Sequence, residues 1–542
     1  MMIDNRIRKR IVFFVMLILL LVALAVAFLQ GDIPFVAESE MAPPEVPPTT
    51  VIKLNSEEGE NGVCVGVPIL TEKELAGYTA YRYADYSSAL RFCGVSVPMD
   101  REQGIIYLPQ NMRNEVNYQQ MQGELTVTLQ RCNLYFAPDE AFLQMSDAMK
   151  SGHGFKLLVV DEDAQTHMEY QVVFTGLPML CLDGGFSNFD KDGESALTGT
   201  LHMFDPKDAD ERAYTIKSSR ASWHLRGATT SRQPKKSWKI DLIDQYRENV
   251  ELALCGLGTD DDWVLNAMSL DDTRMKEKLA MDVWNEMAAE TMRSDNMSVS
   301  RYVEVVINGE YHGLYLLQRR IDEQYLCLEQ DELLFKGKNT WSIRKPEDGY
   351  ELEYSPMSAA DSYRLIESWS KQEDVSVVDV DNFIDVNLFI QWGSMQDNTS
   401  YNNIYYVMYP KENGYGMYMV PWDTDYSMGV LWYNDFFDYQ LEMSAAAITE
   451  RVEYNAMKQQ YPQLESEMAS RWMHLREKAF SEIQIEFRLQ GYRAEICDSG
   501  AFARDRAKWG TFYGEQDNLE NLCRFFEIRL AYLDEYYHVE NS

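Results

Sequence analysis

Oxygen-bearing side chains at two sites close in sequence have the types and the spacing that phosphoryl transfer requires. Asp397 precedes Asn402 by five residues and Asp423 by twenty-six, and Asp425 follows in the same Trp-Asp-Thr-Asp segment. Carboxylate and carboxamide oxygens are the hard ligands that Mg²⁺ prefers, and Mg²⁺ usually takes only one or two protein carboxylates beside water and substrate phosphate. The spacing therefore predicts Asp397 as the residue that orients a hydroxyl, with Asn402 and Asp423 as metal ligands and Asp425 as a second candidate.

A basic stretch upstream supplies candidates for phosphate contacts. Residues 223–242 form two predicted strands around a turn that holds a glycine, small hydroxyl residues and a Lys pair. Backbone N–H groups of such a turn can approach an anion, and a Lys can place a point charge on a phosphate. We expect Arg226 and Lys236 to make these contacts, with Lys235 as the rival of Lys236. A basic hairpin on a solvated sheet face explains the stretch equally well.

The elements that must position these residues indicate an α+β protein. Residues 51–173 show short alternating strands between turns, which predicts a small α+β accessory module without catalytic residues. A larger domain is expected over 174–542, with strands first and mainly helices after about residue 361. A helical stretch is predicted over 272–292, and a β-hairpin is predicted around the turn Asn308-Gly309.

Two predicted strands connect the acidic residues. Residues 402–410 and 416–423 alternate as paired strands do, so a hairpin would carry the chain from Asn402 back to Asp423. The helix expected over 272–292 would pack beside the sheet. By itself this helix predicts packing and no chemistry.

Composition excludes some classes of protein. The 542 residues are 46% hydrophobic and 12% aromatic, which is ample for large cores. Lys and Arg total 50 against 86 Asp and Glu, so the net charge is -36 and the average surface repels a phosphate backbone. Nucleic acid is therefore excluded as an expected partner. The acidity indicates either solubility or a preference for basic, Ser-rich protein substrates.

The N-terminus predicts export. Basic residues precede an apolar run from Ile11 to Leu29, which at ~1.5 Å per residue can cross a hydrocarbon core of roughly 30 Å. Residues 1–29 are thus expected to be a cytoplasmic basic flank and a single-pass membrane anchor, with the rest outside the cell. Residues 30–50 are Pro-rich and predict a stalk. Cleavage after Ala25-Val26-Ala27 as a signal peptide is the alternative, and it would give a secreted protein.

The eight cysteines carry little information. No two of them form a Cys-x-x-Cys pair, so a zinc knuckle is not expected. Eight cysteines are too few for a disulfide scaffold of this size, although export would permit disulfides. Buried thiols and disulfide pairs therefore both stay open.

Four stretches taken in order resemble one family, the spore-coat protein H (CotH) kinases. These are Arg-Gly-x-x-Thr followed by Pro-Lys-Lys-Ser-Trp-Lys-Ile, then Trp-Val-Leu with Asp-x-x-Arg, then Val-Ile-Asn-Gly-Glu-Tyr with Gly-Leu-Tyr, and finally Asp-Asn with Pro-Trp-Asp-x-Asp. The resemblance covers roughly residues 171–430 with its motifs and is expected to extend to about 540. It implies a kinase-like two-lobed fold and a secreted or surface-associated atypical protein kinase. Such an enzyme would use ATP and Mg²⁺ or Mn²⁺ on Ser/Thr of coat proteins.

The resemblance also assigns roles. It implies Asp397 as the catalytic Asp, Asn402 and Asp423 as metal ligands with Asp425 as a further candidate, and Lys236 as the phosphate-contacting Lys. The sequence has no Gly-x-Gly-x-x-Gly and does not identify the Glu that would pair with the Lys.

Two further functions fit the same residues. A non-catalytic surface-binding protein could keep the fold and use residues 51–173 for recognition. A glycan hydrolase could use Asp397 and Asp423 as an acid and base pair, which inverting enzymes hold about 6.5–9.5 Å apart.

Overall fold

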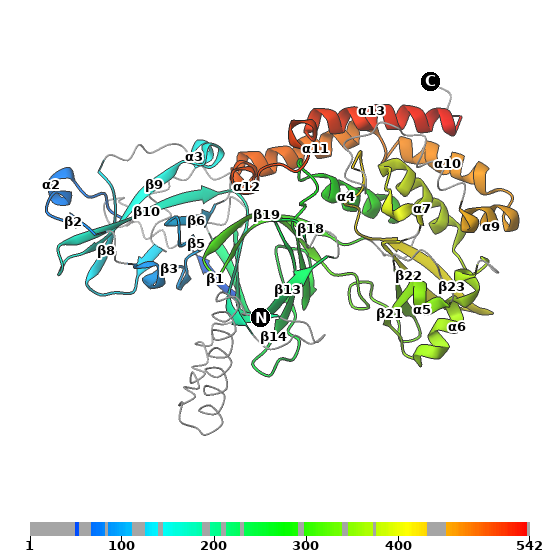
Figure 1. Cartoon of the computed structure of the whole chain (residues 1–542), viewed down its shortest axis with the longest axis horizontal. Helices are drawn as coiled ribbons and strands as arrows, with labels where there is room; N and C mark the ends of the chain where they lie inside the picture. The colour runs from blue at the N-terminus through cyan, green and yellow to red at the C-terminus, as the bar shows by residue number, and fades with distance from the viewer. Residues whose placement is uncertain are drawn as a thin grey trace, which may run out of the picture. The chain divides into compact units, whose positions relative to one another are not determined.

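The computed structural model contains helices and strands in comparable amounts, which confirms the α+β class (Figure 1). It describes residues 49–53, 67–81, 85–110, 125–138, 145–186, 196–206, 213–227, 232–290, 297–338, 345–371, 375–400, 402–430 and 451–538. The predicted anchor over residues 1–29 and residues 30–48 of the predicted stalk lie outside these ranges. The last two residues of that stalk, Thr49 and Thr50, instead begin strand β1 (Thr49–Lys53). Within the ranges, no helix has the length and apolar character needed to cross a membrane.

The N-terminal part is built on two sheets, a larger one with both parallel and antiparallel strand pairs and a smaller antiparallel one. The larger has the order β5-β6-β10-β9-β8, and β2 also pairs with β10. Its strands are β2 (Thr79–Ala80), β5 (Met99–Asp100), β6 (Ile105–Pro109), β8 (Cys132–Phe136), β9 (Gly154–Asp161) and β10 (Thr166–Thr175). The smaller sheet has the order β4-β3-β7, with strands β3 (Leu90–Phe92), β4 (Val95–Ser96) and β7 (Leu125–Val127). The helices of this part are α2 (Glu72–Leu75), η1 (Ser87–Ala89) and α3 (Met145–Ser151).

The core of this accessory part continues into the next sheet. The rings of Tyr107 and Tyr311 stack with centroids 4.5 Å apart, and the backbone N–H of Tyr311 donates to the Asp100 carboxylate over 3.1 Å. Phe204 and Val306 belong to the same buried cluster. The accessory strands therefore pack directly on the larger domain.

Seven strands of the larger domain close into a ring. Their order is β13-β12-β11-β18-β19-β17-β14, and β14 pairs with β13 again. They are β11 (Met179–Phe186), β12 (Leu197–Pro206), β13 (Ala213–Arg226), β14 (Ser237–Ile243), β17 (Asp262–Asn266), β18 (Ser300–Ile307) and β19 (Glu310–Arg319). One edge of β13 pairs with β12. The other edge is long enough to pair with two strands, β1 (Thr49–Lys53) along its first half and β14 along its second half. Figure 1 shows the resulting barrel around β13, β14, β18 and β19.

Side-chain size explains how the barrel closes. Trp223, Trp263 and Tyr315 are fully buried in its interior. Gly184 and Gly199 face each other across β11 and β12. A Cβ on Gly184 would come within 2.6 Å of the Trp223 ring, so only glycine leaves room for the indole.

The hairpin predicted at Asn308-Gly309 is confirmed. It joins β18 to β19, and both turn residues have positive φ, 53° and 75°. Asn-Gly is the pair that favours such a turn between twisted strands.

The remaining half combines a four-stranded sheet with helices. The sheet order is β21-β20-β22-β23, and the predicted strand pair near 402–423 is confirmed as β22 and β23. The elements are β20 (Leu333–Gly337), β21 (Tyr350–Tyr354), β22 (Ile404–Lys411), β23 (Gly414–Pro421), α4 (Lys276–Ala288), α5 (Pro346–Gly349), α6 (Ala359–Ser370), α7 (Val380–Gly393), η4 (Asp397–Ser400), α9 (Val452–Gln460), α10 (Leu464–Arg476), α11 (Glu482–Asp498), α12 (Ala501–Trp509), η5 (Gly514–Gln516) and α13 (Leu519–Tyr536), with the short pair β15 (Leu252–Ala253) and β16 (Thr259–Asp260) beside the barrel.

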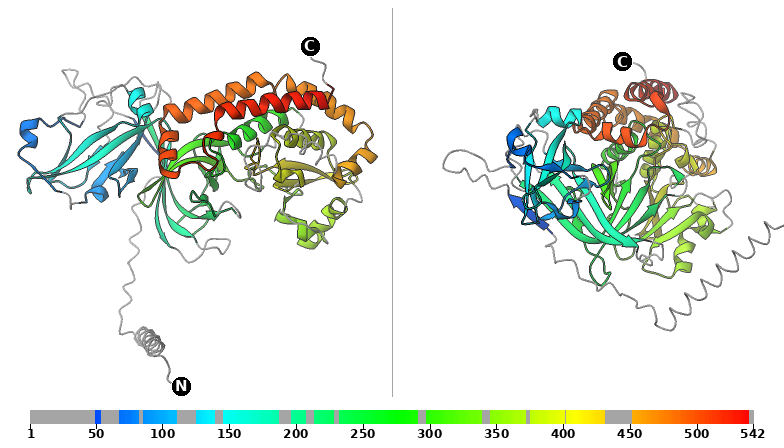
Figure 2. Two further views of the ribbon diagram at one scale, coloured as in Figure 1. Left: turned by 45° about the horizontal axis from the view of Figure 1, so that its top comes forward. Right: turned by 60° about the vertical axis from the view of Figure 1, so that its left-hand side comes forward.

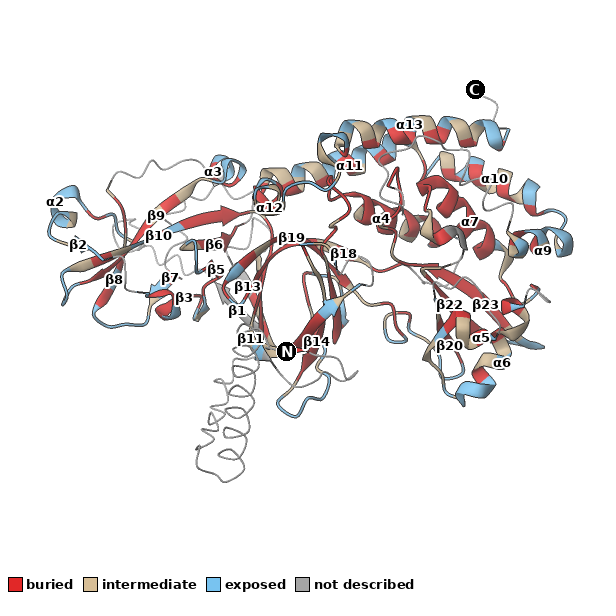
Figure 3. Cartoon of the chain, in the orientation of Figure 1, coloured by how far each residue is buried: buried red, intermediate tan, exposed pale blue. Residues whose placement is uncertain are grey.

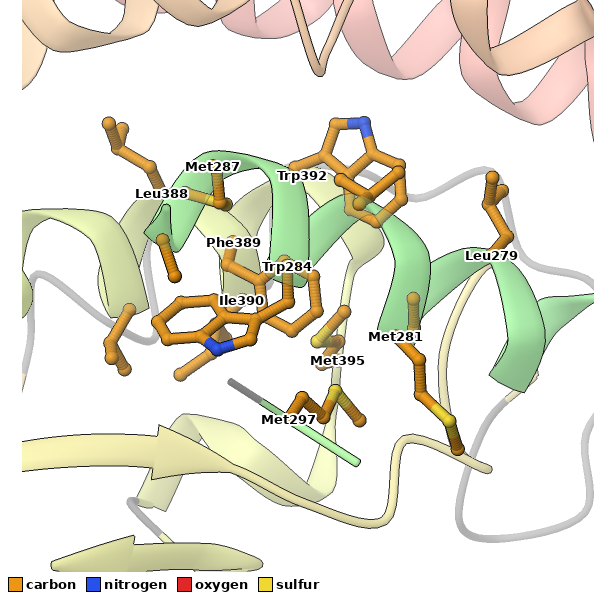
Figure 4. Packing of buried hydrophobic residues seen from close by; sticks show 14 of the residues in the cluster. Leu279, Met281, Trp284, Met287, Met297, Leu388, Phe389, Ile390, Trp392 and Met395 are labelled. Atoms are coloured by element: carbon orange, nitrogen blue, oxygen red, sulfur yellow. The ribbon is translucent and has the colours of Figure 1, made fainter. Parts of the chain in front are cut away.

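Helices α4 and α7 form the centre of this half. Every residue of α7 from Asn382 to Gly393 is buried, and the burial colouring shows both helices enclosed (Figure 3). The rings of Trp284 and Phe389 lie 5.1 Å apart between them, with Met395 close by (Figure 4). Helices α11 and α13 run side by side over this core (Figure 2).

Helix α4 is shorter than the predicted stretch over 272–292. The Asp271 carboxylate accepts hydrogen bonds from the N–H groups of Thr273 and Lys276, and Arg274 has a φ of 61°. These contacts form a tight turn, so the helix begins only at Lys276. Residues 291 and 292 lie outside the described ranges.

No disulfide joins any of the seven cysteines that the structure describes. The kinase-like two-lobed arrangement and the boundary at residue 173 stay predictions.

Candidate active site

A cavity of about 550 Å³, counted out to its mouth, lies where the barrel, α4 and the end of β23 meet. Part of this volume is open solvent at the mouth of the cavity. Its charged lining residues are Arg226, Asp271, Lys276, Glu277, Asp423 and Asp425.

Asp423 is held by its backbone. The N–H of Trp422 donates to the carbonyl of Asn403 over 2.8 Å, and the buried Asn398 amide donates to the carbonyls of Asn403 and Trp422. Asp423 itself has a φ of 51°, a left-handed conformation that is uncommon outside glycine and clusters at functional sites. The chain therefore turns sharply at Asp423, into the cavity wall.

Asp397 follows the end of α7. Ser394 terminates this helix in the left-handed region, and the loop is then pinned by bonds from Gln396 N–H to the Tyr426 carbonyl (3.0 Å) and from Met428 N–H to the Gly393 carbonyl (2.7 Å). Asp397 is half-buried and does not itself line the cavity. Burial, and then the neighbouring charge of Asp423, raise its pKa to about 6.

Glu277 is one of the cavity residues that sequence reasoning missed, together with Asp271 and Lys276. It lies in the first turn of α4, is buried, and accepts a hydrogen bond from the Thr424 hydroxyl over 3.0 Å. Burial and the charge of Asp423 raise its pKa to about 8. A signal was present, because Glu277 shares the helical spacing of the apolar residues Ala280 and Trp284 and so falls on the packed face.

These carboxylates repel one another. The pKa of Asp425 lies well above its ordinary value because of burial and then because of Asp423, Glu277 and Asp397. Hard oxygens gathered at this density suit a divalent cation such as Mg²⁺. Within the described ranges no three His, Cys, Asp or Glu side chains enclose an ion by themselves, and Mg²⁺ requires only one or two carboxylates beside water and phosphate. The donor set therefore fits Mg²⁺ held jointly with a substrate.

Two cations share the cavity wall with these acids. The Arg226 guanidinium lies 5.1 Å from the centre of the Trp422 ring, a cation–π arrangement that orients its planar group. Lys276 is buried and donates to the Asp517 carboxylate over 2.6 Å.

The structure places Lys235 away from the cavity. Its ammonium pairs with Asp505 at 2.7 Å and donates to the Leu314 carbonyl. Arg274 binds the same carboxylate over 2.9 Å. Burial alone would raise the pKa of Asp505, but the two cations hold it below its ordinary value, so the three side chains form a buried ionic cluster.

The other predicted residues are less central. Lys236 and Asn402 are half-buried, and neither is among the described residues that line the cavity. The turn residues 228–231, which were expected to offer N–H groups to an anion, lie outside the described ranges. The cavity thus unites three predicted residues, Arg226, Asp423 and Asp425, with Asp397 close behind.

A family model described as CotH kinase protein matches residues 224–533. No curated protein matches the chain. The matched range begins within β13 and contains every charged residue of the cavity wall.

Proposed function

The chain belongs to the CotH kinase protein family, and we propose that it is an atypical protein kinase that transfers the γ-phosphate of ATP to Ser/Thr hydroxyls of surface or coat proteins. The observation that carries this proposal is the convergence of Glu277, Asp423 and Asp425 on one cavity with Asp397 beside them. Such a cluster is costly without a cation, and phosphoryl transfer brings one with its nucleotide.

Asp397 is the proposed proton acceptor. In the transfer, the substrate hydroxyl oxygen bonds to the γ-phosphorus, the bond from that phosphorus to the bridging oxygen breaks, and ADP leaves. The hydroxyl proton passes to the Asp397 carboxylate. With a pKa of about 6, this group is ionised at neutral pH and more basic than an ordinary Asp.

Asp423 and Asp425 are the proposed metal ligands, with Asn402 as a further predicted ligand. A bound Mg²⁺ or Mn²⁺ would neutralise charge that develops on the phosphate oxygens. Arg226 would orient a phosphate through its stacked guanidinium.

We also propose that the domain acts outside the cell, anchored by residues 11–29, on basic, Ser-rich proteins. The acidic composition supports a basic substrate, because opposite charges speed encounter.

The full-length protein, labelled ATP and a Ser-rich basic peptide test the activity, with and without Mg²⁺. We expect metal-dependent transfer by the wild type and none by Asp423→Asn. Absence of transfer by the wild type to Ser, Thr and Tyr peptides would reject the kinase and leave a surface-binding protein as the alternative.

A further inference from the structure

Thr424 is the buried residue between the two acids that face the cavity. Asp423 and Asp425 both line the cavity. Thr424 is not among the described residues of that wall, and its side chain is fully buried. The middle residue of the segment therefore packs into the protein, while its two neighbours are presented to the cavity.

The partner of Thr424 comes from a distant part of the chain. Its hydroxyl donates to the Glu277 carboxylate over 3.0 Å, across a separation of 147 residues. Glu277 is buried as well and lies in the first turn of α4. A buried hydroxyl without a partner would be costly. The bond therefore ties the segment that follows β23 to α4.

Other contacts hold the same segment from the side of α7. The Asn398 amide donates to the Trp422 carbonyl over 3.1 Å, and the Gln396 N–H donates to the Tyr426 carbonyl over 3.0 Å. Both donors come directly after α7, whereas the acceptor of the Thr424 hydroxyl belongs to α4. The segment is thus fixed between two helices, and Thr424 makes the link to the second one.

We propose that Thr424 is a positioning residue for the metal, because its bond to Glu277 fixes where Asp423 and Asp425 present their carboxylates; this inference rests on the proposed function. Within the described part of the chain, no three acidic side chains form a metal site by themselves. Glu277 is therefore assigned a holding role through Thr424 and not the role of a third ligand.

This arrangement has a consequence for the choice of cation. Mg²⁺ demands near-ideal octahedral geometry with ligands at about 2.0–2.1 Å, whereas Ca²⁺ accepts flexible sites. A fixed residue between two ligands restricts the positions of both. The bond between Thr424 and Glu277 should therefore favour Mg²⁺ and Mn²⁺ over Ca²⁺.

The test is Mn²⁺ binding to the full-length protein in the presence of ADP, followed by the electron paramagnetic resonance of free Mn²⁺. Thr424→Val keeps the shape of the side chain and removes its hydroxyl. It should weaken Mn²⁺ binding about 10-fold, the order of one buried hydrogen bond. Ca²⁺ affinity, measured by displacement of Mn²⁺, should change little. Thr424→Ser keeps the hydroxyl and should bind Mn²⁺ as the wild type does.

The matched control is Thr175→Val. The Thr175 hydroxyl donates to the Glu304 carboxylate and joins β10 to β18; both residues are fully buried, and neither is among the described residues of the cavity wall. The two Val variants therefore remove the same kind of bond from different places. Only Thr424→Val should lose Mn²⁺ affinity.

Thr424→Val leaves a buried carboxylate without this donor and can destabilise the fold. The double variant Thr424→Val/Glu277→Met removes both partners and should fold, with Mn²⁺ binding at least as weak as in Thr424→Val. Wild-type Mn²⁺ affinity in either variant, equal losses for Mn²⁺ and Ca²⁺ in Thr424→Val, or no recovery in Thr424→Ser would overturn the positioning role while the kinase stands. Failure of the wild type to bind Mn²⁺ with ADP would overturn both.

Discussion

Asp397 lies beside Asp423 in a half-buried site, so its negative charge opposes folding at neutral pH. Its pKa is about 6 in the folded protein against an ordinary 3.8, and the folded state therefore holds an extra proton between these values. Stability consequently falls as pH rises from about 4 to about 6, and the full cost persists above pH 6. A neutral side chain at this position avoids that cost.

Asp397→Asn should therefore stabilise the metal-free protein at pH 8 by about 1–2 kcal/mol, after a discount for its partial exposure, and change stability little at pH 4. Turnover should nevertheless fall by about 10²–10⁴-fold because the proton acceptor is lost. Thermal unfolding at the two pH values and steady-state kinetics measure the pair of effects. The control is Asp361→Asn in the exposed first turn of α6, which should leave turnover unchanged. A loss of stability at pH 8 in Asp397→Asn would contradict the electrostatic account.

At the scale of elements, the C-terminal helix α13 supports the loop that carries Asp397. Arg529 is fully buried on α13, and its guanidinium donates to the Gln391 carbonyl over 2.7 Å in the last turn of α7. A cation at this position satisfies a terminal carbonyl and complements the helix dipole. Three residues later Ser394 turns the chain toward Asp397, so the end of α7 determines where Asp397 lies.

Arg529→Met should lower turnover roughly 10–100-fold, since small misplacements of a catalytic group have effects of this size, and leave ATP affinity unchanged. Steady-state kinetics measure turnover, and a direct titration with ATP measures the affinity separately. Arg476→Gln is the control. Arg476 lies on α10 and forms an ion pair of 2.9 Å with Asp534 on α13, the helix that carries Arg529, so this variant removes a contact of α13 that does not involve α7. If the loss of turnover in both variants merely follows the decrease in their thermal midpoints, Arg529 has no positioning role.

At the scale of the whole molecule, we predict that the matched range 224–533 does not fold by itself. It starts near the end of β13 and omits β11 and β12, which stand between β13 and β18 in the barrel. A fragment of residues 224–533 would expose unpaired strand edges, which favour aggregation. We expect it to aggregate or lack near-UV circular dichroism, whereas residues 49–538 should unfold cooperatively. A soluble, cooperatively folding 224–533 fragment would show that the ring is dispensable.

Local patterns in the sequence were sufficient for several elements. The Asn308-Gly309 hairpin and the strand pair before Asp423 depend on turn chemistry and on alternation within about twenty residues, which a sequence displays directly. The sequence also predicted Asp397, Asp423 and Asp425 from their types and spacing, and the structure places Asp423 and Asp425 on the cavity wall. The mixed α+β class followed from these segments.

Tertiary structure alone decided which charged groups meet. Glu277 and Lys276 looked like residues of a packed helix until α4 was placed against the end of β23. Lys235 looked like a phosphate ligand until Asp505, 270 residues further along the chain, was found beside it. The charge and role of a side chain depend on its burial and on partners remote in sequence. Such contacts produce no periodic pattern in the sequence, so they cannot be predicted from it.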